Sequence, residues 1–300
     1  MAEYTSHLAR EIATQPDDWE AVQGRLDEAR SVLPRPGAEV AVVGCGTSAF
    51  MAQAYAALRE STGVGRTDAY VASEFPHTRS YDHVVAISRS GTTTEVIELL
   101  TALKARGQST TALVATEGTT IPQLADQALL LPEVDEQSVV QTRFATTTLA
   151  LLRASLGEDL ACVVAQGRAV LAEDEKSALE GVLDAEQVTF LGRGWAIGIA
   201  HEASLKLRES AQFWTESYPA MDYRHGPISI AGPGRAVWSF GPAPEGLGDE
   251  VTATGAWFED RAIDPLADLL RVQRLCLAKA AMAGVDPDQP RHLSRSIILS

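Results

Sequence analysis

The stretch AISRSGTTTEVIELL, from Ala86 to Leu100, carries five hydroxyl side chains and one glycine within residues 88–94. The apolar run HVVAI leads into these hydroxyl groups and predicts a buried strand. The pattern EVIELLTALKAR follows and predicts an amphipathic helix, with Gly107 just beyond its end as a cap. The hydroxyl groups therefore fall at the turn between a strand and a helix.

More strands of this kind are expected around the turn. The segments with strand character are AEVAVVG, DAYVASEF, DHVVAIS, STTALVA and ADQALLLP. Strands that alternate with helices predict a parallel sheet covered by helices on both faces. The chain before the break LPRPG is expected to be helical, and so is the pattern from Val139 to Leu183.

The strand and helix at the start of this region have a second copy. VAVVGCGTSAFMAQAYAALRE, from Val40, resembles VTFLGRGWAIGIAHEASLKLR, from Val188, and both read as a strand, a G-x-G turn and a helix. The predicted fold class is α/β, with two doubly wound parallel-sheet domains of three layers each, related by duplication. The expected parts are a helical lead-in (1–36), a first domain (37–165), a linker helix (166–186) and a second domain with a C-terminal tail (187–300).

Composition limits the classes of partner. Of the 300 residues, 45% are apolar, which is enough for a sizeable core, and the net charge of −15 argues against nucleic acid and anionic membranes as partners. The opening MAEYTSHLAREIATQ has no apolar signal region, so a cytoplasmic location is expected. Cys45, Cys162 and Cys276 are scattered and the histidines show no ligand spacing, so neither a metal site nor a cofactor is expected.

The hydroxyl run has the properties of an anion site. Ligands of open α/β folds bind at the carboxyl ends of the strands, where the next helix presents unpaired N–H groups and the positive end of its dipole. Serine and threonine add donors there, and Gly91 lets the backbone approach a ligand closely. The run therefore predicts a phosphate cradle. An ordinary helix N-cap is the alternative, although a cap needs one hydroxyl and not five.

A dinucleotide site is the competing interpretation of GCGTSA, from Gly44 to Ala49, which fits a loose G-x-G-x-x-A fingerprint. The acidic residue expected about 20 positions later is poorly placed, and Trp195 after the second G-x-G would crowd a pyrophosphate. One small phosphate held by Thr47, Ser48 and the hydroxyl run accounts for both motifs.

Five motifs occur in the order and spacing of the sugar isomerase (SIS) superfamily. They are GCGTS, SRSGTT, EASLKLRES, YRHGP and the ending DPDQPRHLSRSIILS. The chain resembles the isomerase domain of glucosamine-6-phosphate synthase and single-chain glucosamine-6-phosphate deaminases and ketose-aldose isomerases. The resemblance spans nearly the whole chain and implies a phosphate site made by Ser88, Ser90 and Thr93, with Thr47 and Ser48 nearby.

The resemblance also implies catalytic roles. Glu209 would carry the proton between C1 and C2 of the sugar, His225 would help to open the ring from across a dimer interface, and Lys206 would contact the substrate region. Such an isomerisation needs one base that serves both carbons and a second group that titrates near pH 7. Without the family, Glu209 reads as a solvated helix charge, His225 as a loop histidine, and Lys206 as a surface lysine or the ion-pair partner of a residue one turn away.

The chain departs from the family pattern at the tail. Arg295 in LSRSIIL stands where the synthase has a lysine that forms an imine, and an arginine cannot act as that nucleophile. Arg295 could still hydrogen-bond the substrate, and Arg143 replaces another family lysine. Because the chain opens on MAEYTSH without the synthase's glutaminase cysteine, glutamine-driven amidation is not expected.

The resulting expectation is a homodimeric phosphosugar isomerase that acts on a hexose or hexosamine 6-phosphate, with or without release of ammonia. A ketose/aldose-phosphate isomerase without an amino group is the enzymatic alternative. A non-catalytic phosphosugar sensor is the other alternative, although such sensors usually carry a DNA-binding domain and lack the acid/base pair that Glu209 and His225 would supply.

Overall fold

The computed structural model describes residues 5–299, and the chain folds as two compact units. The five-stranded unit consists of Asp17–Gln137, Gln141–Leu160 and the tail from Ser294. The four-stranded unit consists of the described residues up to Pro16, Ser138–Val140 and Ala161–Leu293. Each unit is therefore assembled from segments that are far apart in the sequence. Each domain expected from the sequence, in contrast, is one continuous stretch of the chain.

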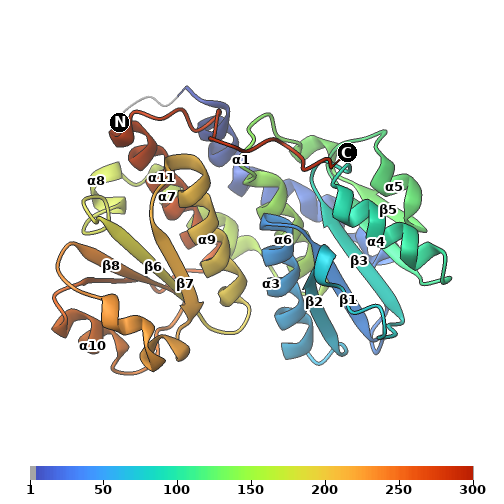
Figure 1. Ribbon diagram of the computed structural model, residues 1–300, viewed down its shortest axis with the longest axis horizontal. Helices are drawn as coiled ribbons and strands as arrows, with labels where there is room; N and C mark the ends of the chain where they lie inside the picture. The colour runs from blue at the N-terminus through green and yellow to red at the C-terminus, as the bar shows by residue number, and fades with distance from the viewer. Residues whose placement is uncertain (1–4, 300) are drawn as a thin grey trace. The chain divides into compact units, whose positions relative to one another are not determined.

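The five-stranded unit has a fully parallel sheet in the order β2-β1-β3-β4-β5 (Figure 1). Its strands are β1 (Val40–Gly44), β2 (Thr67–Val71), β3 (His83–Ser88), β4 (Thr110–Val114) and β5 (Gln127–Leu130). Its helices are α2 (Leu26–Val32), α3 (Thr47–Ser61), α4 (Thr94–Lys104), α5 (Thr120–Leu124) and α6 (Arg143–Ser155), with short 3-10 turns at Val22–Arg25, Ala72–Glu74 and Pro132–Val134. Helix α1 (His7–Ala21) starts in the other unit and ends in this one.

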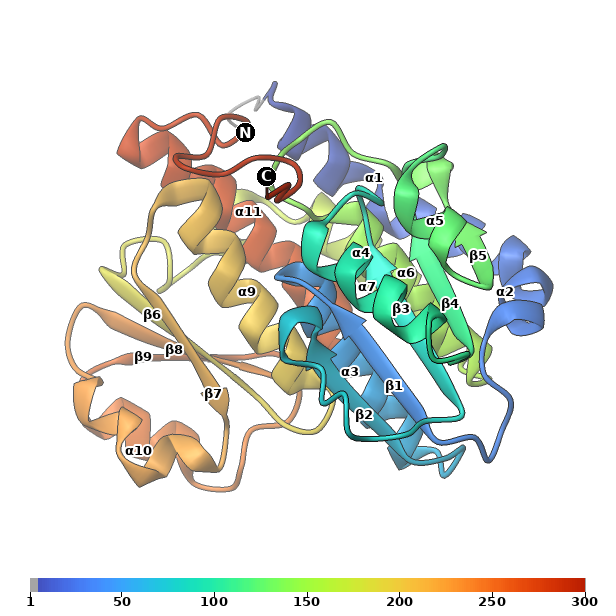
Figure 2. The same cartoon turned by 45° about the vertical axis from the view of Figure 1, so that its right-hand side comes forward.

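Both faces of this sheet are covered. Side chains of a strand alternate between the two faces, and Val43 of β1 and Ala86 of β3 belong to the same buried cluster as Leu99 of α4. Figure 2 shows α4 and α5 lying over that face. Helix α3 contacts β1 and β2, and α6 packs against α3. The parallel sheet and its strand positions confirm the prediction made from the sequence.

The first strand–helix turn depends on a glycine. A Cβ atom at Gly44 would lie 2.6 Å from the backbone carbonyl carbon of Ser48, closer than two carbon atoms can approach. Only glycine therefore allows β1 to pass this closely to the start of α3. The residues that follow, Thr47 and Ser48, are thereby brought to the carboxyl end of β1.

The four-stranded unit has a second parallel sheet in the order β7-β6-β8-β9. The strands are β6 (Gln187–Gly192), β7 (Thr215–Pro219), β8 (Arg235–Phe240) and β9 (Trp257–Asp260). The helices are α7 (Ala161–Ala172), α8 (Glu175–Ala178), α9 (Ala196–Ala211), α10 (Leu247–Ala253) and α11 (Pro265–Ala283), with 3-10 turns at Asp222–His225 and Pro227–Ile230. This order repeats that of the first four strands of the other sheet, and the origin of both units by duplication stays a prediction.

A buried charge network lies inside the four-stranded unit. Arg271 of α11 is fully buried; its guanidinium donates to Asp268 Oδ1 at 2.9 Å, to Glu259 Oε1 at 2.6 Å and to the Ala178 carbonyl at 2.8 Å. Trp238 of β8 donates its indole N–H to Asp268 at 2.8 Å, and the guanidinium carbon lies 4.5 Å from the centroid of that ring. The network ties α8, β8, β9 and α11 together.

The helical pattern from Val139 to Leu183 proves to be three helices, α6, α7 and α8. Gly157 lies at φ +94° just after α6, a left-handed conformation that a continuing helix does not allow. Asp174 then starts α8 by accepting the backbone N–H of Ser177 at 3.0 Å. Near-continuous apolar periodicity hid these two breaks in the sequence.

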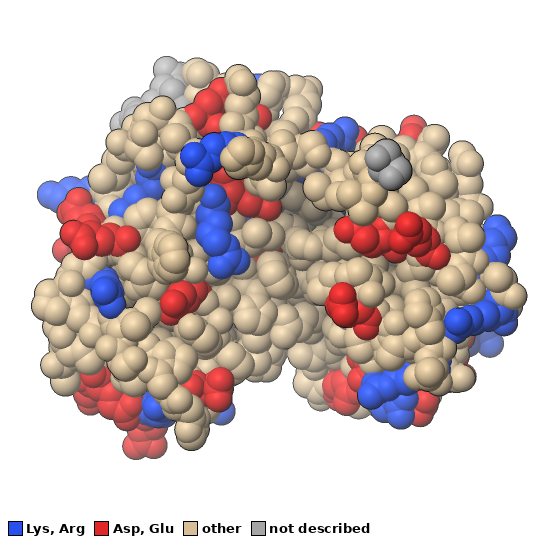
Figure 3. Space-filling view, viewed as in Figure 1, with Lys and Arg blue, Asp and Glu red and all other residues tan. Residues whose placement is uncertain are grey.

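One face of the molecule shows how its charged side chains are distributed. Acidic and basic side chains are scattered over the face drawn in Figure 3. Cys45, Cys162 and Cys276 are free thiols. Within residues 5–299, no helix combines the length and the apolar character needed to cross a membrane.

Candidate functional site

The hydroxyl run lies where the sequence placed it, between the end of β3 and the start of α4. Ser88 and Ser90 are buried, and the backbone folds back on their side chains: Gly91 N–H donates to Ser88 Oγ at 3.3 Å, and Thr92 N–H donates to Ser90 Oγ at 3.3 Å. Ser90 Oγ also lies 3.4 Å from Thr93 Oγ1. Three of the predicted phosphate-binding side chains are thus gathered in one turn.

Gly91 is required for the shape of this turn. Its φ of +66° is in the left-handed region, and a Cβ there would lie 1.9 Å from Thr119 Oγ1. Thr93 occupies the N-cap position of α4, but its side chain makes no capping hydrogen bond. The alternative interpretation, that the run serves only as a helix cap, therefore does not explain why a hydroxyl group is present at Thr93.

Thr47 and Ser48 lie at the neighbouring turn. Both side chains are buried at the start of α3, and β1 pairs directly with β3, so the carboxyl ends of these two strands are adjacent. Cys45 lies in the same turn, where burial and the nearby Glu95 carboxylate raise the pKa of its thiol to about 11. The thiol is therefore protonated at neutral pH and is a poor nucleophile.

The C-terminal tail lies on the hydroxyl run. Ser296 Oγ accepts hydrogen bonds from Ser90 Oγ at 3.1 Å and from Thr92 Oγ1 at 3.0 Å. The Ile297 carbonyl accepts the backbone N–H of Thr94 at 3.1 Å, and Thr94 Oγ1 accepts the N–H of Leu299 at 2.9 Å. Nothing in the sequence motifs pointed to these contacts.

Arg295 is also engaged within this unit. Its guanidinium pairs with the Asp135 carboxylate and donates to Thr116 Oγ1 at 3.2 Å. The buried Arg89, in the middle of the SRSGTT motif, donates to the Arg295 carbonyl at 2.8 Å and lies 3.6 Å from the Glu136 carboxylate. The backbone carbonyl and the side chain of Arg295 are therefore both held by residues of this unit.

The other predicted site residues lie on α9 in the four-stranded unit. Lys206 is buried, and its Nζ is 2.5 Å from Glu209 Oε2 and 3.6 Å from Glu202 Oε1. The Glu209 side chain is 19% exposed, whereas those of Lys206 and Glu202 are each 1% exposed. Glu209 is thus the member of this ion-paired group that can meet a ligand from solvent.

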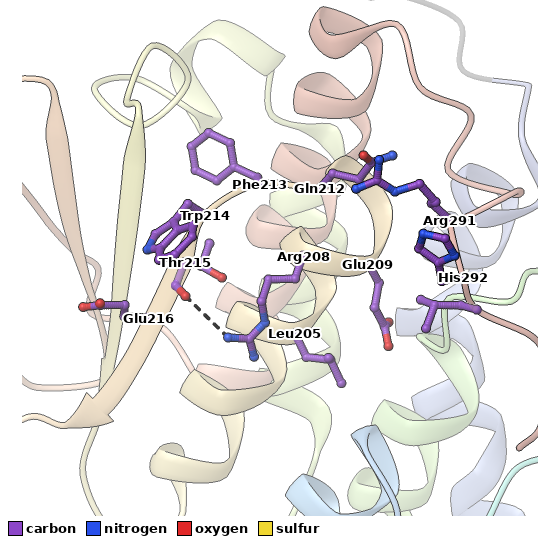
Figure 4. A pocket seen from close by; sticks show the side chains of 11 residues that line it. Leu205, Arg208, Glu209, Gln212, Phe213, Trp214, Thr215, Glu216, Arg291 and His292 are labelled. Atoms are coloured by element: carbon purple, nitrogen blue, oxygen red, sulfur yellow. Dashed lines mark hydrogen bonds between the residues drawn. The ribbon is translucent and has the colours of Figure 1, made fainter.

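Glu209 lines a cavity of about 650 Å³ (Figure 4). Its walls come from α9, the start of β7 and the segment after α11: Leu205, Arg208, Glu209, Gln212, Phe213, Trp214, Thr215, Glu216, Arg291, His292 and Leu293. Figure 4 shows the Glu209 side chain between Arg208 and His292. The Trp214 side chain is exposed, which gives the cavity an aromatic wall.

His225 occupies a different place in the same unit. It ends the 3-10 turn Asp222–His225 and is exposed, and among the described residues those that line the Glu209 cavity do not include it. The structure also gives no group of three or more histidine, cysteine, aspartate or glutamate side chains arranged to hold a metal ion within residues 5–299.

Comparisons with known proteins identify the five-stranded unit. Residues 37–156 match the sequence profile of the SIS domain. The chain contains a SIS domain. This SIS domain includes β1 to β5 and both predicted phosphate-binding turns.

Two curated relatives extend the likeness beyond the SIS domain. Both are named glutamine–fructose-6-phosphate aminotransferase (isomerizing). The protein from Leifsonia xyli is 26% identical over 98% of this chain and 59% of its own length, and the one from Corynebacterium efficiens is 29% identical over 91% and 52%. The chain therefore spans between half and three fifths of the length of these relatives.

Solved structures show that the fold around the SIS domain is shared as well. A glucosamine-6-phosphate deaminase from Thermotoga maritima superposes with a TM-score of 0.87 and 24% identity, covering 98% of this chain and 100% of its own. A tagatose-6-phosphate ketose/aldose isomerase from Escherichia coli gives a TM-score of 0.80 and 17% identity, covering 97% of each chain. At these identities, the likeness establishes the fold.

Several residues around the hydroxyl run and around Glu209 were not identified from the sequence. Glu202 could have been found, because it lies four residues before Lys206, the spacing of an ion pair on one helix face. Arg89 stood inside a recognised motif without an assigned role. Ser296 and His292 stood inside the recognised tail motif without an assigned role, because their neighbours in space are set by the path of the tail.

Proposed function

We propose that this protein is a phosphosugar isomerase that acts on a hexose or hexosamine 6-phosphate. The observation that carries the proposal is the turn between β3 and α4. Buried hydroxyl groups lie there beside the start of the helix, and the Thr93 side chain makes no capping hydrogen bond. The names of the relatives and of the similar folds support a sugar phosphate as the ligand. The finer proposal, an amino sugar phosphate with or without release of ammonia, rests on those names.

In the proposed reaction the hydroxyl groups bind the phosphate and Glu209 moves a proton. The carboxylate takes the proton from C2 of the open-chain aldose and returns it to C1, while the proton of the C2 hydroxyl moves to the C1 oxygen, which gives the ketose. If C2 carries an amino group, the same transfer gives an imine, and water converts that imine to the ketose and ammonia. Lys206, 2.5 Å from the Glu209 carboxylate, fixes the position of that carboxylate. Contact of Lys206 with the substrate remains part of the proposal.

Ring opening is assigned to His225, and the proposal includes a homodimer that brings it to the substrate of the partner chain. The support is its exposed position at the end of the 3-10 turn after β7. A histidine titrates near neutral pH and so both donates and accepts protons there. The descent of both units from one duplicated SIS-type domain is proposed on the shared strand order.

Thr93→Ala is expected to weaken binding of fructose 6-phosphate by about 1–2 kcal/mol, the usual loss for a hydrogen bond to a charged group. Titration calorimetry of both proteins gives the difference directly. Binding of fructose without its phosphate is expected to stay unchanged. Thr101→Ala is the matched control, because it removes an exposed hydroxyl from the same helix that bonds only to the Ile97 carbonyl at 2.7 Å. An equal loss in both variants would contradict a phosphate site at Thr93.

No covalent sugar adduct is expected during turnover. The Arg295 guanidinium is paired with Asp135, and an arginine side chain cannot form an imine with the ketose. Borohydride added to the working enzyme should leave the protein mass unchanged in mass spectrometry. A sugar-sized increase would show imine formation on a lysine, and Lys206 would be the first to examine by peptide mapping.

The proposal is tested by offering hexose and hexosamine 6-phosphates and scoring ketose and ammonia separately. Ketose with ammonia identifies a deaminase-like reaction, and ketose alone a plain aldose–ketose isomerase. Tight binding without turnover would favour the second candidate, a non-catalytic phosphosugar sensor. The observation on its side is Arg295, which occupies the family's lysine position and is engaged in an ion pair.

A further inference from the structure

A second cavity, of about 380 Å³, lies within the five-stranded unit. Its size is typical of small-molecule sites. Its lining comes from the end of α2 and the loop before β1, from the second half of α3 and the loop before β2, and from the end of α6. Thr47 begins α3 at the carboxyl end of β1 and Arg59 lies in the last turn, so about 18 Å of helix separate the two. The cavity is therefore distinct from the hydroxyl run and its neighbouring turn.

The charge of the cavity lining is opposite to that of the chain. The sequence has 40 acidic and 25 basic residues. Among the described residues that line the cavity, three are arginines, at positions 30, 35 and 59, and none is an aspartate or a glutamate. The protein as a whole repels an anion, whereas this group of arginines attracts one locally.

Arg59 places a buried positive charge beside the cavity. The residue is 0% exposed. Its Nη1 donates to the Thr67 hydroxyl at 2.7 Å and to the carbonyls of Ala38 at 3.1 Å and Gly65 at 3.2 Å. Its Nη2 donates to the Arg35 carbonyl at 3.1 Å. These partners satisfy the N–H groups but are uncharged, and a buried charge is stabilised by a nearby charge of opposite sign. An anion in the cavity would supply that charge.

The loop that carries Arg35 is held in one conformation. Pro34 and Pro36 flank the residue, and each proline fixes its own φ. The Arg35 carbonyl is bound by the buried Arg59 guanidinium. The Arg35 side chain is exposed, as is that of Arg30 at the end of α2. Because the backbone is already fixed, little of its conformational entropy is lost when the guanidinium binds a ligand.

The rest of the cavity wall has a different character. Most of it is apolar or aromatic and consists of Leu33, Pro34, Pro36, Tyr55, Val64 and Leu156. Guanidinium groups bind phosphate oxygens in pairs, with two parallel N–H bonds. Such a wall beside them suits the apolar part of a ligand. The cavity thus matches a ligand with a phosphate group at one end and an apolar body at the other.

We propose that this cavity is a second ligand site, which binds a phosphate monoester with an apolar or aromatic body. Arg30 and Arg35 donate to the phosphate oxygens, Arg59 contributes its charge from inside the fold, and the apolar wall covers the body of the ligand. The site goes beyond the proposed function, because it lies apart from the hydroxyl run and involves no turnover.

The test uses phenyl phosphate as the probe and follows the modification of arginine side chains by 2,3-butanedione, mapped on peptides by mass spectrometry. Phenyl phosphate should slow modification of Arg35 severalfold in the wild-type chain. Arg106 is the internal control, because it is an exposed arginine of the same unit that donates to the His77 carbonyl at 2.7 Å and does not line the cavity. Its modification should not change. No protection of Arg35, or equal protection of Arg106, would overturn the proposal.

A substitution at the neighbouring arginine shows whether the two side chains share one ligand. Arg30→Gln should raise the concentration of phenyl phosphate that protects Arg35 by about tenfold, the effect of losing a hydrogen bond to a charged group. Arg30 is exposed, so the fold should tolerate the change. Arg106→Gln removes the same charge elsewhere in the unit and should leave the protection as in the wild type. Unchanged protection in Arg30→Gln, or an equal effect of both substitutions, would refute a shared site.

Two simpler probes test the two halves of the ligand. Inorganic phosphate should protect Arg35 only at higher concentration, because it lacks the apolar body, and benzyl alcohol should not protect it, because it lacks the charge. Equal protection by inorganic phosphate, or any protection by benzyl alcohol, would overturn the proposed ligand class.

Thr93→Ala separates this site from the proposed phosphate site. Protection of Arg35 by phenyl phosphate should be the same in this variant as in the wild type, and its loss would refute two separate sites. If fructose 6-phosphate fails to bind while phenyl phosphate protects Arg35, the proposed function is refuted and the second site stands.

Discussion

Turnover of a hexose 6-phosphate is expected to fall by about 10²–10⁴-fold when Glu209 is replaced by glutamine. The amide keeps the shape of the side chain and its reach into the cavity, but it cannot take a proton from carbon. Affinity for the substrate should change little. The decisive measurement is exchange of deuterium from C2 of the substrate into solvent, which should stop in the variant.

Glu216→Gln is the matched control for this experiment. Glu216 lines the same cavity from β7, where its carboxylate accepts the Tyr218 hydroxyl at 3.2 Å, and it is not part of the ion-paired group of Lys206. Turnover of this variant should stay close to that of the wild type. Exchange at the wild-type rate in Glu209→Gln would show that another residue is the base.

Arg271→Met is expected to lower the free energy of unfolding by about 3–5 kcal/mol, the usual loss when one partner of a buried ion pair is removed. The substitution leaves Asp268, whose side chain is 0% exposed, and Glu259, whose side chain is 10% exposed, without the cation between them. Urea unfolding at neutral pH measures the difference. Arg224→Met is the control, since its pair with Glu250 is on the surface, where water screens it, and the stability of this variant should stay close to that of the wild type.

The deficit of Arg271→Met should also depend on pH. Burial raises the pKa of Asp268 to about 6 in the folded wild type, above its usual value of 3.8, although Arg271 acts in the opposite direction. The folded protein therefore holds this proton more tightly than the unfolded chain, so stability from Asp268 is lost as pH rises from about 4 through 6. Without Arg271 the pKa rises further, and the deficit should be smaller at pH 5 than at pH 8. A deficit that is equal at both values would contradict this origin.

The parallel sheets were predictable because their signal is local. Val40–Gly44 and the centre of His83–Ser88 are rich in valine and isoleucine, which is typical of strands that are buried on both faces. The position of the turn residues that follow was predictable for the same reason, since a hydroxyl run directly after a buried strand lies at the carboxyl end of that strand. The breaks in the pattern from Val139 to Leu183 were not, because apolar periodicity carries on through them.

In the candidate site, too, contacts between residues close in the sequence were predictable, and contacts between distant residues were not. Lys206 shows this most clearly: among its sequence-based alternatives was an ion-pair partner one turn away, and the structure pairs it with Glu209 and Glu202. That contact is within one helix. The contact of Ser296 with Ser90 joins residues 206 positions apart, and no local pattern specifies it.

That separation of 206 positions has a consequence for the order in which the protein is made. Synthesis runs from the amino end, and domains generally fold as units while the rest of the chain is still being added. The β3–α4 turn leaves the ribosome long before residue 294 does. On the nascent chain, therefore, the hydroxyl groups of this turn stay open to solvent until the tail is made, and the contacts of Ser296 are among the last that this unit forms.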